Sequence, residues 1–308
     1  MTEREDRFEI RLGERGYPGS VAELPDAPRV LYVRGAPETL EDRSISIIGS
    51  RRATPYGLAV SELAARLAVE SGITVVSGGA RGCDQAAGRA ALDAGGRHVI
   101  VLGTGADVVY PASARRLVED ALDRGGCVVS LEPWGTPPQR WAFPKRNRVI
   151  ASLSDATFVA EAGMPSGTFS TAETANALGR ELIAVPGSIF APESRGTNYL
   201  IANGACCIGD EEALEVALSR IYGTLRFNRG HAGGVGGLDR DGRAVLGMLV
   251  ACPMRAEDIA ARMRIDGAAC MALLSRLEIA GVVSRMPDGR ISPSKSALHA
   301  LTSLGHNG

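Results

Sequence analysis

The stretch SISIIGSRRATPYGLAVSELAARLAVESGITVVSG, residues 44–78, decides the fold. Two runs rich in β-branched residues enclose a segment in which Leu58, Leu63 and Leu67 recur at helical spacing, while Glu62 falls on another face. This strand–helix–strand order is typical of a parallel sheet covered by helices. We therefore expect an α/β fold with a Rossmann-like, doubly wound, mostly parallel sheet.

The same alternation of short β-branched runs and longer Ala- and Leu-rich segments extends from Arg29 to about Ile208. Further strands are expected at the runs RVLYV, HVIVLG, CVVSL, ATFVAE, ELIAVPG and a short CCI. We expect one Rossmann-like domain over residues 1–224, in which residues 1–28 form an N-terminal extension.

A second, smaller domain is expected after a Gly-rich linker at residues 225–237. Residues 238–294 read as three helices followed by two short extended pieces around the turn PDG, which is the order of a winged-helix module. Residues 295–308 are expected to be a flexible tail.

Composition limits the kinds of function that the chain can have. Its 34 Lys and Arg nearly balance 35 Asp and Glu, so a polyanion site must be a local patch. The sequence contains neither a secretory signal nor a run of eighteen apolar residues, which predicts a cytoplasmic protein without membrane association. The six cysteines form no CxxC pair and the four histidines are scattered, so we expect no metal and no cofactor.

Glycine-rich polar loops follow several expected strands: GSRR (49–52), SGGARGCD (77–84), GTGADVVYP (103–111) and EAGMPSGTFSTAETA (161–175). In an open α/β sheet, ligands bind outside the carboxyl ends of the strands. Glycines let the backbone approach a ligand, and helix N-termini favour anions. These loops predict a phosphate-binding rim, with tight strand-to-helix turns as the alternative. The chain lacks GxxxxGK[ST], which argues against a P-loop hydrolase.

The segment WGTPPQRWAFPKRNRVIASLS, residues 134–154, is basic in a neutral chain. It contains no acidic residue, and Trp141 and Phe143 interleave with its cations, Arg140, Lys145, Arg146 and Arg148. Cations that follow a sugar–phosphate backbone, together with aromatic faces that stack on unpaired bases, favour single-stranded nucleic acid over a duplex. The alternative is a solvated charge run whose two aromatic residues lie in the core.

The residues form no recognisable catalytic constellation. Carboxylates near the strand ends have no histidine partner, and Ser50 and Ser166 lack a general base or a GxSxG elbow, so we expect no enzyme. The expected recognition helix of the small domain presents mainly small or apolar side chains, Ala268, Ala269, Met271 and Ala272. Base reading needs Arg, Asn or Gln there, so packing or partner binding is favoured over DNA reading.

The chain resembles the DprA/Smf family, the DNA-processing proteins of bacterial natural transformation. The matching stretches, in the family's order, are YPGSVAELPDAPRVLYVRG, IIGSRRATPYG, VVSGGARGCDQAAGRAAL, VLGTGADVVYP, FPKRNRVIASLS, SGTFSTAETA, VPGSIFAPESRGTN and LIANGA. They span Tyr17 to Ala205. The resemblance implies a homodimer that binds and protects incoming single-stranded DNA and loads the RecA recombinase onto it, without catalytic turnover.

The resemblance also implies roles for residues. Gly49, Ser50 and Arg51 match the phosphate-gripping turn, with Arg51 the principal cation, whereas Phe143 matches the base-stacking aromatic and Arg140 the basic residue three places before it. The residues expected to bind single-stranded DNA are Gly49, Ser50, Arg51, Arg52, Arg140, Phe143, Lys145, Arg146, Asn147, Arg148, Ser166, Gly167 and Thr168.

Three positions depart from the family's pattern. Cys83 stands where a hydrophobic residue is usual, Gly88 stands where a histidine is usual, and Glu132 lies one place later than the usual acid.

Two rival functions remain open. The first is a nucleoside-monophosphate phosphoribohydrolase of the lysine-decarboxylase-like Rossmann group, whose hallmark is PGGxGTxxE. The best match is PSGTFSTAE, in which Thr171 occupies the position of the required glutamate. The second is a transcription regulator that reads duplex DNA through the winged helix.

Overall fold

A nine-stranded sheet organises most of the chain. The computed structural model describes residues 6–223, 238–294 and 297–298, so the linker predicted at 225–237 and most of the tail predicted at 295–308 lie outside the described residues. The strand order is β1-β2-β6-β5-β4-β3-β7-β8-β9. The strands are β1 (Arg7–Arg11), β2 (Val30–Gly35), β3 (Ser44–Ile48), β4 (Thr74–Ser77), β5 (His98–Leu102), β6 (Cys127–Ser130), β7 (Ala156–Val159), β8 (Glu181–Ala184) and β9 (Cys206–Cys207).

Seven of these strands, β3 to β9, pair in parallel, and the order reverses where β3 lies between β4 and β7. Such a reversal is the topological switch point at which doubly wound sheets bind ligands. The expected doubly wound, mostly parallel sheet is confirmed. Sequence reasoning missed β1, which pairs antiparallel with β2, and β2 in turn pairs antiparallel with β6.

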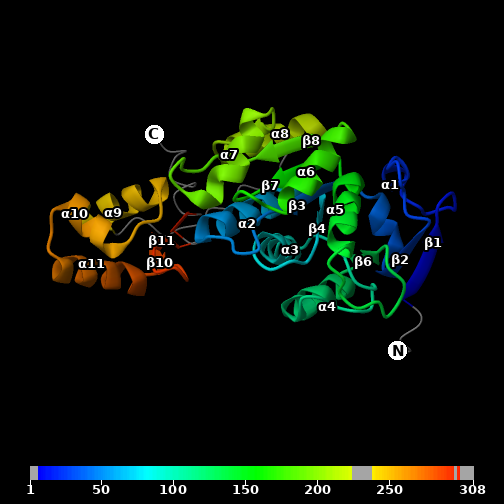
Figure 1. Cartoon of the computed structure of the whole chain (residues 1–308), viewed down its shortest axis with the longest axis horizontal. Helices are drawn as coiled ribbons and strands as arrows, with labels where there is room; N and C mark the ends of the chain where they lie inside the picture. Colours follow the sequence, from blue (N-terminus) through cyan, green and yellow to red (C-terminus); the bar gives the residue numbers. More distant parts are fainter. Residues whose placement is uncertain (1–5, 224–237, 295–296, 299–308) are drawn as a thin grey trace.

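Helices cover both faces of the sheet (Figure 1). One layer holds α1 (Gly19–Ala22), α5 (Ala142–Leu153), α6 (Thr168–Ala177) and α7 (Arg195–Ala202). The other layer holds α2 (Pro55–Glu70), α3 (Cys83–Asp93), α4 (Arg115–Asp123) and α8 (Glu211–Tyr222). Three short 3₁₀ helices are η1 (Pro37–Glu41), η2 (Ala112–Ala114) and η3 (Pro192–Ser194).

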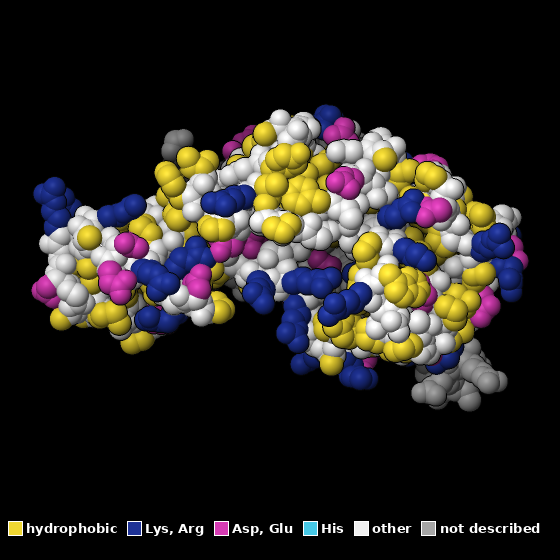
Figure 2. Space-filling view, in the orientation of Figure 1, with side chains coloured by type: hydrophobic (Ala, Val, Ile, Leu, Met, Phe, Trp, Pro, Cys, Tyr) yellow, Lys and Arg dark blue, Asp and Glu magenta, His cyan; other side chains and the backbone are white. Residues whose placement is uncertain are grey.

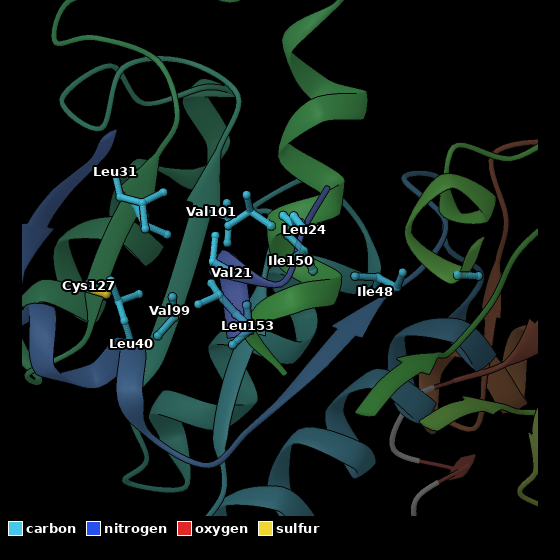
Figure 3. Packing of buried hydrophobic residues seen from close by; sticks show 14 of the residues in the cluster. Val21, Leu24, Leu31, Leu40, Ile48, Val99, Val101, Cys127, Ile150 and Leu153 are labelled. Carbon is cyan, nitrogen blue, oxygen red and sulfur yellow. The ribbon is translucent and has the colours of Figure 1, made fainter. Parts of the chain in front are cut away.

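Burial of apolar side chains fixes α5 across the middle of the sheet. Ile150 and Leu153 of α5 lie next to Val21 and Leu24 around α1, over the apolar strand residues beneath them (Figure 3). Removal of this apolar surface from water is the main force that holds the helix in place. The N-terminal part of α5, with Phe143 and Arg146, lies at the carboxyl edge of the sheet.

A winged-helix module stands at one end of the elongated molecule (Figure 1). Its elements are α9 (Arg240–Ala251), α10 (Ala256–Met263), α11 (Gly267–Ile279), β10 (Val283–Arg285) and β11 (Ile291–Pro293). The two strands pair antiparallel around the turn, as expected from sequence. The module has its own apolar core, and Arg290 in its wing forms an ion pair with Glu193 of the large domain.

One departure from the family's pattern has a packing explanation. A Cβ atom on Gly88 would lie 2.5 Å from Nε2 of His98, a fully buried side chain on β5. The imidazole hydrogen-bonds with the carbonyl of Val75 through Nδ1 and with the hydroxyl of Ser77 through Nε2. Gly88 therefore makes room for a histidine that comes from β5.

Within the part of the chain that the structure describes, none of the helices has the length and apolar character needed to span a membrane.

Candidate nucleic-acid interface

Two adjoining hollows occupy the switch point at the carboxyl edge of the sheet. The β3–β7 hollow, about 480 Å³, is lined by nine predicted residues, Gly49, Ser50, Arg51, Arg52, Arg146, Asn147, Ser166, Gly167 and Thr168. The Phe143 hollow, about 570 Å³, is lined among others by Arg51, Arg52, Gly78, Ala80, Arg81, Tyr110, Phe143 and Arg146. The two share Arg51, Arg52, Ala80 and Arg146 and so form one cleft.

The loop after β3 is held tightly from both sides. The amide of Ser50 donates to the carbonyl of Glu161 at 2.8 Å, and the amide of Cys83 donates to the carbonyl of Ser50 at 3.2 Å. A Cβ on Gly49 would lie 2.6 Å from Sγ of Cys83. Gly82 has φ +79°, and a Cβ there would lie 2.2 Å from the Ser50 carbonyl oxygen. Only glycines allow this approach, which leaves the Arg51 side chain exposed at the cleft.

Glu161 fixes the start of α2 beneath this loop. Its carboxylate is 3% exposed and accepts hydrogen bonds from the amide of Thr54 at 3.0 Å and from the Thr54 hydroxyl. The same hydroxyl accepts from the amide of Gly57 and caps the helix. Burial raises the pKa of Glu161 to about 7. The hydrogen bonds from Thr54 lower this pKa, but the effect of burial is larger. Glu161 therefore supports the loop from below, and its own side chain does not line the cleft.

The exposed cations of the cleft have no acidic partner. Arg51, Arg52 and Arg81 are exposed, and none forms an ion pair with a carboxylate among the described residues. Arg81 belongs to the SGGARGCD loop, but sequence reasoning did not single it out. Unpaired guanidinium groups on a cleft are available to phosphate oxygens.

Arg146 behaves differently from these cations. It is 4% exposed, and one of its terminal nitrogens donates to the carbonyls of Gly78, at 2.6 Å, and Val101. Burial lowers its pKa to about 10, while the charge of buried Asp84 raises it. Asp84 in turn accepts from the amide of Gly78 at 3.0 Å. Arg146 therefore forms the floor of the cleft and holds the ends of β4 and β5 together.

Aromatic side chains frame the Phe143 hollow. The half-buried ring of Phe143 lies 5.8 Å from the ring of Tyr110, centroid to centroid. The guanidinium carbons of Arg51 and Arg146 lie 5.7 Å and 5.8 Å from the Phe143 centroid. Tyr110, which is 46% exposed, was missed from sequence although it lies in an expected rim loop. A cation beside an aromatic face is the arrangement on which an unpaired base can stack.

The start of α6 closes the β3–β7 hollow. The hydroxyl of Ser166 donates to that of Thr168, and the Thr168 amide donates to the Ser166 hydroxyl at 3.2 Å. Asn147 on α5 donates to the hydroxyl of Ser170 at 2.9 Å, which ties α6 to α5. These bonds bring the predicted turn at Gly167 to the same hollow as Arg51.

The remaining predicted cations lie elsewhere. Lys145 and Arg148 face the other side of α5, because residues three apart share one side of a helix. Arg148 forms an ion pair with Asp26, and Nζ of Lys145 lies 4.6 Å from the ring centroid of Trp141. Arg140 is exposed just before the helix and lines neither hollow. The structure therefore divides the basic segment between two sides of α5.

Figure 2 shows how charge is distributed over the face of the molecule that Figure 1 presents to the viewer. Lys and Arg side chains gather at the centre of its lower edge, around a notch over the region where Figure 1 places α3 and α4. Toward the two ends of the molecule, basic and acidic side chains intermingle. Positive charge is thus concentrated locally in a chain whose formal net charge is −1.

Comparisons with known proteins match both parts of the chain. The family model for DNA recombination-mediator protein A matches residues 9–218, and the model for the DprA winged helix domain matches residues 235–289. Protein Smf of Escherichia coli (strain K12) is 38% identical over 200 residues, which cover 65% of this chain and 54% of that protein. The chain thus spans about half the length of this curated relative.

Two solved structures share the fold. The X-ray structure of DNA processing protein A from Streptococcus pneumoniae has a TM-score of 0.64 at 34% identity, and the match covers 68% of this chain and 74% of that one. A structure on the single-stranded DNA binding mode of DNA processing protein A from Helicobacter pylori has a TM-score of 0.63 at 28% identity. That match covers 70% of this chain and 97% of that one.

Proposed function

Because this chain belongs to the DNA recombination-mediator protein A family, we propose that it binds single-stranded DNA in the cleft at the switch point. The protein holds the strand by its phosphates and by stacking on its bases. As a homodimer, it protects incoming DNA and loads a RecA-type recombinase onto it.

One observation carries the DNA-binding part of this proposal. The unpaired cations Arg51 and Arg52 line both hollows of the cleft, and the ring of Phe143 lies within 6 Å of the Arg51 guanidinium. Phosphates of a bound strand lie against the arginines and the Gly49 turn, while a base stacks on Phe143 beside Tyr110. A duplex keeps its bases stacked on each other, so this arrangement favours a single strand. The structure of the Helicobacter pylori relative supports the same ligand.

The lining of the cleft argues against nucleotide hydrolysis. Thr171 lines the β3–β7 hollow at the position where the phosphoribohydrolase group needs a glutamate. The buried carboxylate of Asp84, which also lines that hollow, accepts hydrogen bonds from the amides of Gly78 and Ala80. We therefore propose that the protein works by binding, without turnover.

The winged helix fits a partner or packing role better than base reading. The exposed residues of α11 include Ala268, Ala269 and Met271, and Arg276 forms an ion pair with Asp239. Side chains that read base edges are thus scarce on this helix.

Fluorescence anisotropy of labelled oligothymidine, and of a labelled duplex of the same length, tests DNA binding. We expect tighter binding of the single strand, weakened by Arg51→Ala and by Phe143→Ala, with each lost stacking contact contributing on the order of 1–3 kcal/mol. Arg220→Ala is the control, because Arg220 pairs with Glu181 at the amino end of β8, away from the cleft. Equal loss in all three variants, or equal affinity for the duplex, contradicts the proposal.

Recombinase loading needs a separate assay. RecA ATPase activity on single-stranded DNA coated with single-strand-binding protein reports filament assembly, and we expect the protein to shorten its lag. The Arg51→Ala variant should lose this effect in proportion to its loss of DNA affinity. An unchanged lag with tight DNA binding would reject loading and leave DNA binding intact. Light scattering of the protein alone tests the homodimer.

A further inference from the structure

A third hollow, which the proposed function leaves unused, lies on the other side of α5. This Trp141 hollow has a volume of about 510 Å³ and lies between the chain entering β2, the end of β6 and α5. Trp141 is 52% exposed, which is unusual for the largest apolar side chain. Nζ of Lys145 lies 4.6 Å from the centre of its ring. The hollow therefore offers an accessible aromatic face with a cation beside it.

The strand order places this hollow on the same edge of the sheet as the cleft. The cleft lies at the carboxyl ends of β7, β3, β4 and β5, and the next strand outward is β6, whose end lines the Trp141 hollow. Trp141 immediately precedes α5 and Phe143 lies in its first turn, and the two side chains line hollows on opposite sides of that helix. A DNA single strand that leaves the Phe143 hollow and passes around the N-terminus of α5 therefore reaches Trp141 next.

The charges around the Trp141 hollow suit the same ligand. Arg148 is matched by Asp26, with which it forms an ion pair. Arg29 and Lys145 line the hollow, are exposed, and have no carboxylate partner within the described ranges, whereas Glu132 is the other acid of the lining. A local excess of positive charge beside an indole ring favours a base together with its phosphate.

We infer that the Trp141 hollow is a second base-stacking site for the same single strand, which wraps around the N-terminus of α5 and fills both sides of that helix. This inference rests on the proposed function, because it extends the path of a strand held in the cleft. Trp141 stacks on a base, and Lys145 and Arg29 contact the phosphates that flank it.

Intrinsic fluorescence gives a direct test, since the chain has two tryptophans. Trp134 packs edge-on against Tyr32, and its indole nitrogen donates to Glu9, so Trp134→Phe leaves Trp141 as the single reporter. We expect oligothymidine to quench this fluorescence, and quenching should begin only at lengths beyond the shortest oligonucleotide whose binding depends on Phe143.

Affinity provides the second readout. Trp141→Ala should weaken binding of long oligothymidine about 10-fold, within the range known for loss of one stacked base, and leave the short oligonucleotide unchanged. Trp141→Phe keeps an aromatic face and should restore most of the affinity. Tyr199→Ala is the matched control, because Tyr199 on α7 is 49% exposed and lines none of the three hollows.

The outcomes separate this inference from the proposed function. If Phe143→Ala weakens binding but Trp141→Ala has no effect at any length, the wrapped path is wrong and the cleft remains the binding site. If the wild type binds no single strand, both fail. If thymidine monophosphate quenches Trp141 as strongly as the oligonucleotide at equal nucleotide concentration, the hollow takes a free nucleotide, and the continuous path is overturned.

Discussion

Replacing Glu161 with glutamine should change how the stability of the protein depends on pH. The carboxyl is 3% exposed, and burial raises its pKa from 4.5 to about 7. Between these pH values the folded protein keeps a proton on Glu161 that the unfolded chain releases. This group therefore contributes stability below about pH 4.5 that is lost as the pH rises to 7. The shift corresponds to about 3 kcal/mol of unfolding free energy.

A second buried group acts in the opposite direction. Burial lowers the pKa of His98 from 6.5 to about 4, so the folded protein binds fewer protons than the unfolded chain in that interval. His98 therefore stabilises the protein as the pH rises from 4 to 6.5, by a similar amount. The two contributions nearly cancel in the wild type. Because Glu161→Gln removes only the first, the difference between the two proteins isolates Glu161.

Urea unfolding at half-unit steps from pH 4.5 to pH 8 measures this difference. We expect Glu161→Gln to gain about 3 kcal/mol relative to the wild type across the range, with most of the change between pH 5 and 7. Glutamine keeps a carbonyl oxygen that can accept from the Thr54 amide, so the start of α2 remains capped. Two parallel stability curves would refute the reasoning, because they would mean that Glu161 titrates alike in the folded and unfolded states.

Three further outcomes are expected. Arg51→Ala should reduce the slope of log affinity against log salt by about 0.7, the value for one phosphate contact on a single strand, and an unchanged slope would contradict its role. Gly49→Ala should cost about 1–3 kcal/mol in urea unfolding, because its Cβ would lie 2.6 Å from Sγ of buried Cys83; an unchanged midpoint would contradict this packing. Arg290→Ala removes the ion pair with Glu193, so amide hydrogen exchange in β10 and β11 should become faster, and equal rates would contradict this contact.

The fold was predictable because its central strands are buried on both sides. β3, β4, β5 and β7 consist entirely of buried residues. Apart from Ser44, Ser46, Ser77 and His98, all their residues are apolar or β-branched. The strand β1 was missed for the converse reason. In RFEIR only Ile10 is buried. The run alternates polar and apolar residues, but it is only five residues long and lies in a charged N-terminal stretch that is predicted to be an extension.

The candidate site was predictable in its loops and less so in its helix. The turns at Gly49 and Gly167 reach the same hollow because carboxyl ends of parallel strands meet at one edge. The basic run before and within α5 reads as one patch, yet helical geometry sends Arg146 inward and Arg148 to the far side. Burial of Arg146 depends on the carbonyls of Gly78 and Val101, which lie 68 and 45 residues away in sequence. Local sequence carries no signal of these contacts.

A nearly neutral chain can carry a polyanion site because its ion pairs are unevenly distributed. Many arginines, such as Arg34 and Arg89, are paired with carboxylates and add little to the field at a distance. In the cleft, the buried charges of Arg146 and Asp84 offset each other in the floor, whereas the rim arginines, Arg51 among them, have no acidic partner among the described residues. Because salt screens charges beyond about 8–10 Å, a DNA strand at this edge is attracted by the rim arginines and is little affected by charges elsewhere on the protein. Net charge therefore underestimates the attraction that the cleft offers to phosphate.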